Sequence, residues 1–372
     1  MSEQISVKKD RIISVDTLRG LAMFMILSTQ IGGAPIFKTF VNLFGQGFVD
    51  AASGQLTWAN QGVTILNIPQ SIFIFVVGLV IPFSLGSRLL RADKKGIYLH
   101  VITRTVILFF LGLIAGGHLL QFQLDKFYYY NNVLEYISIG YLFCSILVIN
   151  VNIKVQCVVT GGLLLLVWAI YLFVSAPGWH GDRYSNEMNI GIYIDNVVLG
   201  PHGHPFKGWT AVLNTIGQIS NMMLGVLVGH IIFGSRDKAD KTKVLFLCGL
   251  IMFFAGVIWG QFFPILRSNM TSSYVLEACG ISTLLLASLY LIIDVWGYSK
   301  WAFFFIVFGA NSIAIYMMAH LFKFNLIGDV FVGGLCRFFS TNVQDFIQAV
   351  AAMMVMWLIM YYMYCKKTFI KI

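Results

Sequence analysis

Long apolar segments alternate with short polar segments along the whole chain, and this pattern predicts membrane-spanning helices. A helix that crosses the hydrocarbon core of a bilayer needs about 20 mostly apolar residues. A shorter segment, 326–339, carries Asp329, Gly333, Gly334 and Arg337, so it predicts a re-entrant or interfacial piece. The segments of spanning length are 13–33, 64–87, 101–121, 132–150, 155–175, 210–233, 243–263, 273–295, 301–321 and 343–365. The expected fold is an all-α polytopic membrane protein with about ten crossings, forming a single domain over residues 1–372.

The basic residues predict which side of the membrane each loop faces. Cytoplasmic loops of membrane proteins carry an excess of lysine and arginine. With the N-terminus inside, 17 of the 25 basic residues fall on the cytoplasmic side and seven on the outer side, leaving Arg19 aside. We therefore expect a multi-pass protein of the inner (cytoplasmic) membrane with both termini in the cytoplasm. Residues 1–11 form a cytoplasmic tail without a signal-peptide cleavage site, and 34–63 and 176–209 form long outer loops.

Composition narrows the classes of function. The chain is 58% hydrophobic and only 11% charged, whereas a soluble domain is about 25% charged. Its formal charge of +9 is spread between apolar segments, so we expect no nucleic-acid partner. The cysteines show no CxxC spacing, and the motif GPHGHP at 200–205 has few acidic residues nearby. We expect neither a disulfide framework nor a metal, and no P-loop motif indicates an ATP-driven machine.

Polar residues inside the apolar segments predict a hydrated interior. Such residues are costly in lipid and usually face a cavity or a partner. Hydrogen bonding between helices explains any one of them, but their number over several helices favours a polar path. These residues are Gln30, Asn67, Gln70, Glu135, Asn214, Gln218, Asn221, Gln261, Glu277, Asn311 and His320.

The first apolar segment begins with a charged pair, in the stretch RIISVDTLRG. Asp16 and Arg19 are three residues apart and therefore share one face of a helix. Two interpretations stay open. The pair anchors the helix near the cytoplasmic interface, or Arg19 forms part of an anion-binding site.

Four stretches of the chain resemble the heparan-α-glucosaminide N-acetyltransferase family and its bacterial relatives, in the same order. SVDTLRGLAMFMIL resembles the first family helix, whose signature is S-(V/L)-D-x-(L/F)-R-G. IPFSLGSRLLR follows IFIFVVG as in the second helix. PILRSNMTSSYVLEACGISTLLLASLYLIID resembles the W-T-S-S-(F/Y)-V-L segment, and FGANSIAIYMMAHLF resembles the G-x-N-S-(I/L)-x-x-Y helix with its following histidine. The resemblance extends from about residue 12 to the C-terminus.

The resemblance implies an integral-membrane acyltransferase. Acetyl-CoA would bind from the cytoplasm as cosubstrate, and an amino sugar or glycan on the outer side would receive the acetyl group. The other expected partner is membrane lipid, and a homodimer stays open. Phosphate groups prefer arginine and lysine, so the candidates for donor binding are Arg19, Arg88, Lys94, Lys95 and Arg104. Asp16 is a further candidate, because it shares a helix face with Arg19. The candidates for acceptor binding are His204, Asn311 and His320.

The positions that handle protons in the family differ in this chain. The catalytic histidine of the family falls on or near Thr57, and residues 34–63 contain no histidine. The acidic residue near the second helix falls on Asn67, and the asparagine late in the first helix falls on Gln30. A threonine hydroxyl cannot act as a general base near neutral pH, because it titrates far too high.

Three hypotheses follow for the missing base. Another histidine serves, with His118 at the end of the third helix as first choice and His204 as second. Alternatively, Gln30 and Asn67 orient the acceptor without a histidine. In the third case the fold has lost transferase activity, and the protein is a carrier for a small solute or a binding protein.

Overall fold

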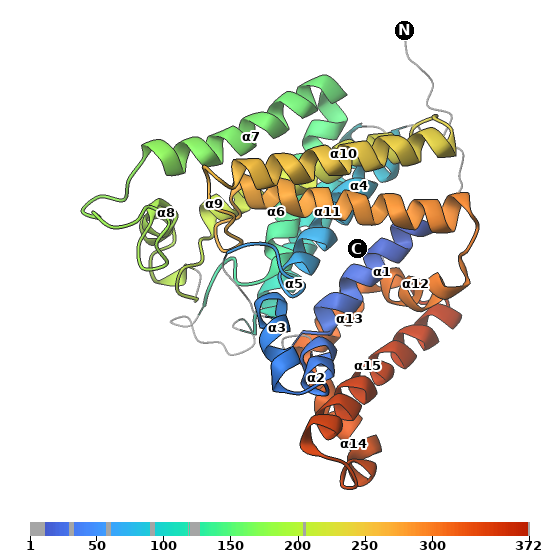
Figure 1. Cartoon of the computed structure of the whole chain (residues 1–372). Coiled ribbons are helices and arrows are strands. Elements are labelled where there is room, and N and C mark those ends of the chain that lie inside the picture. The colour runs from blue at the N-terminus through green and yellow to red at the C-terminus, as the bar shows by residue number, and fades with distance from the viewer. Residues whose placement is uncertain are drawn as a thin grey trace.

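The computed structural model is helical throughout its regular elements over the residues that it describes, which are 12–29, 33–56, 61–89, 94–117, 119, 127–203 and 206–370 (Figure 1). The helices are α1 (Ile13–Leu27), α2 (Ile36–Asn42), α3 (Gln46–Leu56), α4 (Ile68–Leu89), α5 (Lys94–Ala115), α6 (Val133–Asn150), α7 (Ile153–Phe173), α8 (Ile190–Val198), α9 (Val212–Ile232), α10 (Lys238–Trp259), α11 (Ser272–Tyr290), α12 (Phe303–Ala310), α13 (Ser312–Leu321), α14 (Phe324–Cys336) and α15 (Thr341–Cys365).

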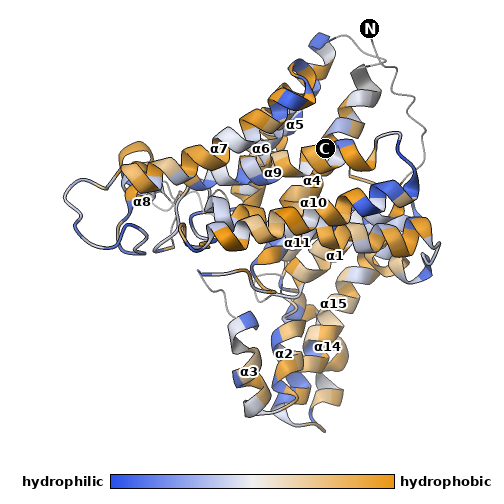
Figure 2. Cartoon of the chain, turned by 45° about the horizontal axis from the view of Figure 1, so that its top comes forward, coloured by the Kyte–Doolittle hydropathy of each residue, from blue (hydrophilic) through white to orange (hydrophobic). Residues whose placement is uncertain are grey.

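Eight helices in the described part are long and apolar enough to cross a membrane, namely α4, α5, α6, α7, α9, α10, α11 with its continuation to Val295, and α15. The pair α12 and α13 is apolar enough to cross as well, but it is bent by 64° at Asn311, so it forms either a broken ninth span or a re-entrant loop. Helix α1 has 15 described residues and contacts α4 and α12. Figure 2 shows apolar residues along most helices, and hydrophilic residues gather at helix ends and in the connecting loops. The chain is therefore an all-α polytopic membrane protein, as its sequence predicts.

Several boundaries differ from the predicted ones. Helices α5 and α10 begin at Lys94 and Lys238, ahead of the expected starts at 101 and 243. The charged residues of these first turns are compatible with a membrane helix because long basic side chains extend to the interface. The predicted loops contain the short helices α2, α3 and α8. The weak apolar piece 326–339 is α14, which packs against α15 (Figure 1).

Asparagine side chains explain where three helices start. Asn132, Asn152 and Asn189 each precede a helix, and each side-chain oxygen accepts a hydrogen bond from a backbone N–H of the first turn. The first N–H groups of a helix have no partner inside the helix, so a capping oxygen stabilises the start by about 1 kcal/mol. The starts of α6, α7 and α8 are thus encoded locally.

Contacts between helix termini define two ends of the bundle. The start of α1, the start of α10 and the end of α11 meet through Asp294, whose carboxylate accepts hydrogen bonds from the N–H groups of Ile13 (3.3 Å) and Ser14 (3.1 Å) and whose carbonyl accepts one from Lys238 (2.7 Å). We call this the α1 end. The starts of α4, α9 and α11 meet at the opposite end, where the loop before α11 bonds to Gln70 and Asn214. We call this the loop end.

Replacing Asp294 by alanine is expected to lower the free energy of unfolding by about 0.5–2 kcal/mol, because the start of α1 loses its capping carboxylate. The measurement is thermal unfolding in detergent. Asp240→Ala is the matched control, since Asp240 is an exposed carboxylate in the first turn of α10 at the same end. Equal melting temperatures for the two variants would contradict a capping role for Asp294.

Candidate functional site

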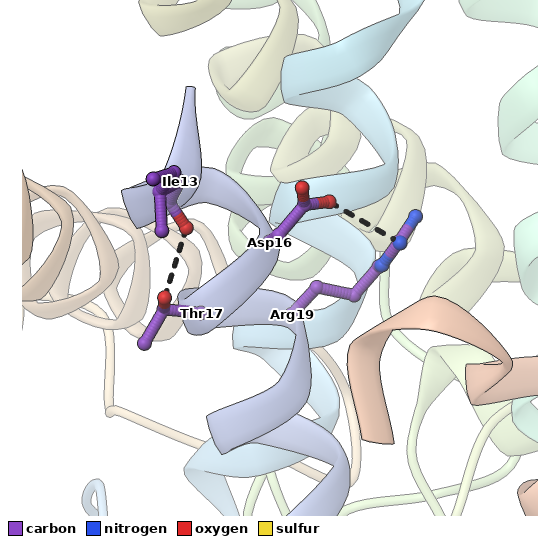
Figure 3. A network of polar contacts seen from close by, with 4 residues as sticks. All are labelled: Ile13, Asp16, Thr17 and Arg19. Atoms are coloured by element: carbon purple, nitrogen blue, oxygen red, sulfur yellow. Dashed lines mark hydrogen bonds and ion pairs between the residues drawn. The ribbon is translucent and has the colours of Figure 1, made fainter. Parts of the chain in front are cut away.

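Asp16 and Arg19 form an ion pair, which is the contact that the anchoring interpretation expects. Nη2 of Arg19 lies 3.4 Å from Oδ1 of Asp16, and both side chains are partly buried. Figure 3 shows the two side chains pointing to one side of α1, while the hydroxyl of Thr17 donates back along the helix to the carbonyl of Ile13 (2.8 Å). Arg19 therefore presents a partly neutralised positive charge inside the bundle.

The other basic donor candidates differ in their surroundings. Lys94 and Lys95 are exposed in the first turn of α5, and the side chain of Arg88 lies outside the described part. Arg104, farther along α5, packs its guanidinium carbon 4.4 Å from the ring centroid of Tyr141. Nε of Arg104 is buried and takes part in no hydrogen bond, and Arg104 forms no ion pair with any described residue. A guanidinium over an aromatic face retains its charge and its donors for an anion.

Tyr141 belongs to a row of buried polar residues on one face of α6. Glu135, Ser138, Tyr141 and Ser145 follow one another at intervals of three or four residues and are each at most 1% exposed. We call these four residues the α6 stripe. A face with this spacing is continuous along a helix, so the stripe carries polar groups from the loop end towards the middle of the bundle.

The α6 stripe is poorly satisfied by the protein itself. Within the described part, Oε1 of Glu135, the hydroxyl of Tyr141 and Oγ of Ser145 are buried without a hydrogen bond. Seven of the thirteen buried side-chain atoms in this condition belong to α1, α5 and α6. Buried polar groups in folded proteins are nearly always hydrogen-bonded, and each exception needs a reason. A polar ligand or a row of water molecules along the α6 stripe would supply the missing hydrogen bonds.

A second polar group lies at the loop end, around Arg267 in the loop before α11. Its Nη2 donates to Oε1 of Gln70 (2.7 Å), and its guanidinium carbon lies 4.8 Å from the ring centroid of Trp209. Nearby, the hydroxyl of Tyr274 lies 3.2 Å from Oγ of Ser71. We call Gln70, Trp209, Arg267 and Tyr274 the loop-end cluster. Its arginine is only 6% exposed.

An electrostatic interaction between Arg267 and the hydroxyl of Tyr136 links the loop-end cluster to the start of α6. Burial lowers the pKa of Arg267, which stays protonated because free arginine titrates far above neutral pH. In the loop before α6, burial raises the pKa of Tyr130, and the nearby charges of Glu135 and Asp195 raise it further. Asp195 has a structural role, since its carboxylate accepts hydrogen bonds from the backbone of Ala211 (2.6 Å) and Val212 (2.9 Å) at the start of α9.

The amide side chains of α9 are used between helices. Nδ2 of Asn214 donates to the carbonyl of Ser268 (2.9 Å), and its Oδ1 accepts from Gln218 (3.1 Å). Asn221 donates to the carbonyl of Ser71 (3.3 Å) and accepts from Sγ of Cys279 (3.1 Å). These residues fix α9 against α4 and the loop before α11, as polar side chains often do between membrane helices.

Three further predicted residues also engage the protein directly. Asn67 accepts from the backbone of Thr64 (2.8 Å) and donates to the carbonyl of Gly62 (3.0 Å), so it shapes the turn before α4. Asn311 donates to Thr368 and accepts from Ile370, which ties the C-terminal segment to the break between α12 and α13. In α13, Nδ1 of His320 lies 2.9 Å from the carbonyl oxygen of Tyr316. Neither hydrogen bond of Asn311 joins it to the loop-end cluster.

Four predicted site residues lie in segments that the structure does not describe, and one predicted interior residue lies at the surface. Gln30, Thr57, His118 and His204 lie outside the described residues. Gln261, expected inside the bundle, is exposed because it follows the end of α10. In the described part, no group of three or more histidine, cysteine or acidic residues lies close enough to hold a metal ion.

Sequence reasoning assigned no site role to Glu135 or Arg267. The available signal for Glu135 was its position three residues after Asn132, which is the spacing of a capping box. For Arg267 the signal was an isolated arginine just before a Thr-Ser-Ser helix start. Neither signal reveals which side chains converge on these residues.

The fold and its interior define a class of protein, a helical membrane protein with buried polar residues between its helices. Comparison with models of known protein families finds no match, and no curated protein matches the chain. The relationship to a particular family therefore stays an expectation from the quoted motifs.

Proposed function

We propose that the protein is an integral-membrane acyltransferase that moves an acetyl group from acetyl-CoA to an amino sugar or glycan on the other side of the membrane. The observation that carries this proposal is the α6 stripe. Its unsatisfied polar atoms run inside the bundle from Arg104 towards the loop-end cluster. A transferase with donor and acceptor on opposite sides needs such an interior path, because a thioester and a polar acceptor must meet away from lipid.

The donor is proposed to bind through arginine and lysine side chains towards the α1 end. Arg19 and Arg104 would contact the phosphate groups of CoA inside the bundle, and the exposed Lys94 and Lys95 would attract them at the entrance. Arginine suits this role because its planar donors match phosphate oxygens in pairs. The thioester would then extend along the α6 stripe.

The acceptor is proposed to bind at the loop end. The loop-end cluster offers an aromatic ring, a guanidinium group and a phenol hydroxyl, which suit a polar sugar with hydroxyl and amino groups. Helices α2, α3 and α8 lie in the segments expected to face outwards. In this proposal both termini face the cytoplasm and the protein resides in the inner membrane.

The decisive experiment measures binding and transfer on the purified protein in lipid nanodiscs. Equilibrium binding of acetyl-CoA and the formation of acetylated glucosamine from labelled acetyl-CoA are followed separately. The proposal expects both. Absence of acetyl-CoA binding at millimolar concentration would overturn it.

A second candidate function, a carrier for a small solute, is favoured by the 64° break between α12 and α13. Broken helices at the middle of a membrane form substrate sites in many transporters. Uptake of labelled amino sugars into proteoliposomes without acetyl-CoA would support the carrier over the transferase.

The proposed orientation predicts the outcome of cysteine labelling. In a cysteine-free background, Ser185→Cys is expected to react with a membrane-impermeant maleimide added to intact cells, since 176–209 is proposed to face outwards. Asp240→Cys, exposed at the start of α10, is expected to react only after permeabilisation. The reverse pattern would invert the proposed topology.

A further inference from the structure

Acetyl transfer requires a group that accepts a proton from the attacking acceptor. The family's histidine position falls on Thr57, whose hydroxyl cannot do this near neutral pH. Among the described residues, the proposed function calls for a buried acid–base group beside the α6 stripe. Glu135, the first residue of the α6 stripe, meets this requirement, because it is fully buried and one carboxylate oxygen has no hydrogen bond.

The local backbone holds the carboxylate of Glu135 in one position. Its Oε2 accepts a hydrogen bond of 2.6 Å from the backbone N–H of Tyr130, and Asn132, three residues before Glu135, caps α6 through the N–H of Leu134. Tyr130 has a φ of 57°, in the left-handed region that bulky residues rarely adopt. Backbone strain of this kind collects at functional sites. The strained turn directs an N–H group at one oxygen of the carboxylate.

The second oxygen of Glu135 is left for another partner. Oε1 accepts no hydrogen bond from any described residue, and Glu135 forms no ion pair with a described residue. The adjacent hydroxyl of Tyr136 is likewise buried without a partner. Across the interface, Gly112 of α5 has no side chain, and a Cβ there would lie only 2.6 Å from Cγ of Glu135. A glycine at this position makes room for the carboxylate between the two helices.

The location of Glu135 fits the geometry of the transfer. It lies at the loop end of α6, where Tyr136 and Arg267 interact electrostatically. Arg104, the proposed contact for the donor, stacks on Tyr141, six positions farther along α6, which corresponds to about 9 Å along the helix axis. The carboxylate thus lies between the proposed donor and acceptor positions.

We propose that Glu135 is the general base of the acetyl transfer, an inference that rests on the proposed function. The neutral amine of the acceptor attacks the thioester carbonyl carbon, and a C–N bond forms. The C–S bond then breaks, and the thiolate of CoA leaves with the bonding electron pair. Oε1 of Glu135 takes the proton that the nitrogen releases and returns it to the thiolate, so the products are the N-acetylated acceptor and CoA thiol.

The test compares Glu135→Gln with the wild-type protein. The amide oxygen of glutamine can accept the hydrogen bond from Tyr130 that Oε2 of Glu135 accepts, so the start of α6 and the melting temperature are expected to persist. Binding of acetyl-CoA is expected to stay unchanged. The rate of acetyl transfer is expected to fall by about 10²–10⁴-fold, the usual contribution of a general base. The acidic limb of the wild-type pH–rate profile should also disappear, which a purely structural role would not cause.

Two control variants sharpen the result. Glu277→Gln removes a half-buried carboxylate on α11 with an unsatisfied oxygen of its own, and it is expected to leave the transfer rate within about twofold of the wild type. His118→Ala tests the histidine favoured by sequence. Full transfer activity in Glu135→Gln, or loss of the rate in His118→Ala alone, would overturn the role of Glu135 while leaving the transferase itself established.

Failure of the transferase proposal gives a different result. If the wild-type protein neither binds acetyl-CoA nor acetylates any amino sugar, the proposed function fails before the variants are compared. If the wild-type protein transfers acetyl groups but Glu135→Gln and Glu277→Gln have the same transfer rate, the proposed function stands. The assignment of Glu135 as the base is then wrong.

Discussion

Replacing Arg19 and Arg104 together by glutamine is expected to weaken acetyl-CoA binding by about 10²–10⁴-fold. Each hydrogen bond to a charged phosphate contributes about 1.5–3 kcal/mol, and two such losses add if the sites act independently. Both side chains are partly buried, and Nε of each is fully buried, so solvent screens them less than it screens surface lysines. The effect should therefore persist at high salt. Isothermal titration in detergent at two salt concentrations measures it.

The matched control removes the same two charges from the surface. Lys154 and Lys243 are exposed near the α1 end, and Lys154→Gln with Lys243→Gln should change the affinity little at physiological salt. Substitution of Lys94 and Lys95 should give an intermediate loss that fades as salt rises, because both are exposed. An affinity that is the same in the arginine double variant and the control would place CoA elsewhere or rule out its binding.

Replacing Gly225 by valine is expected to destabilise the fold by about 3 kcal/mol or more, the upper range for overpacking. A Cβ at Gly225 would lie 2.2 Å from the carbonyl oxygen of Phe75, and one at Gly229 would lie 2.3 Å from that of Leu79. These glycines are four residues apart, the spacing that lets membrane helices pack closely. The backbone of α4 cannot move aside as a flexible side chain would. Loss of monodisperse protein in size-exclusion chromatography measures the effect.

Gly162→Val is the control for the glycine contact. It makes the same substitution on α7, but a Cβ at Gly162 would meet no atom within 4 Å. Valine has a higher helix propensity than glycine by a few tenths of a kcal/mol, so no loss of stability is expected from this substitution. Similar chromatograms for the two variants would show that the close approach of α4 and α9 is not required for stability.

The sequence by itself determined the class of fold and several local features. Apolar length fixes which segments can span a bilayer, because unpaired backbone groups are not tolerated in lipid. The pairing of Asp16 with Arg19 also follows from the sequence, since residues three apart on a helix are neighbours. The asparagine caps of α6, α7 and α8 are local in the same way. Each of these features depends on residues within one turn or one segment.

Tertiary structure decided which buried polar residues are satisfied and which are not. In the sequence, Glu135 and Asn221 look alike, as single polar residues in apolar segments. Asn221 bonds to Ser71 and Cys279, which are distant in the chain, and thus its amide is used between helices. One oxygen of Glu135 bonds to the turn before its own helix, and the other receives no hydrogen bond from the described protein.

The same holds for Asp294 and Arg267. Asp294 caps a helix that starts 281 positions earlier in the chain, and Arg267 bonds to Gln70 across 197 positions. A local pattern can fix the helix on which such a residue lies and the face that it occupies. Its partner depends on how the helices pack, because the contact is made only when segments far apart in the chain are brought together. The packing of the helices therefore decided which of the buried polar side chains have a hydrogen-bond partner.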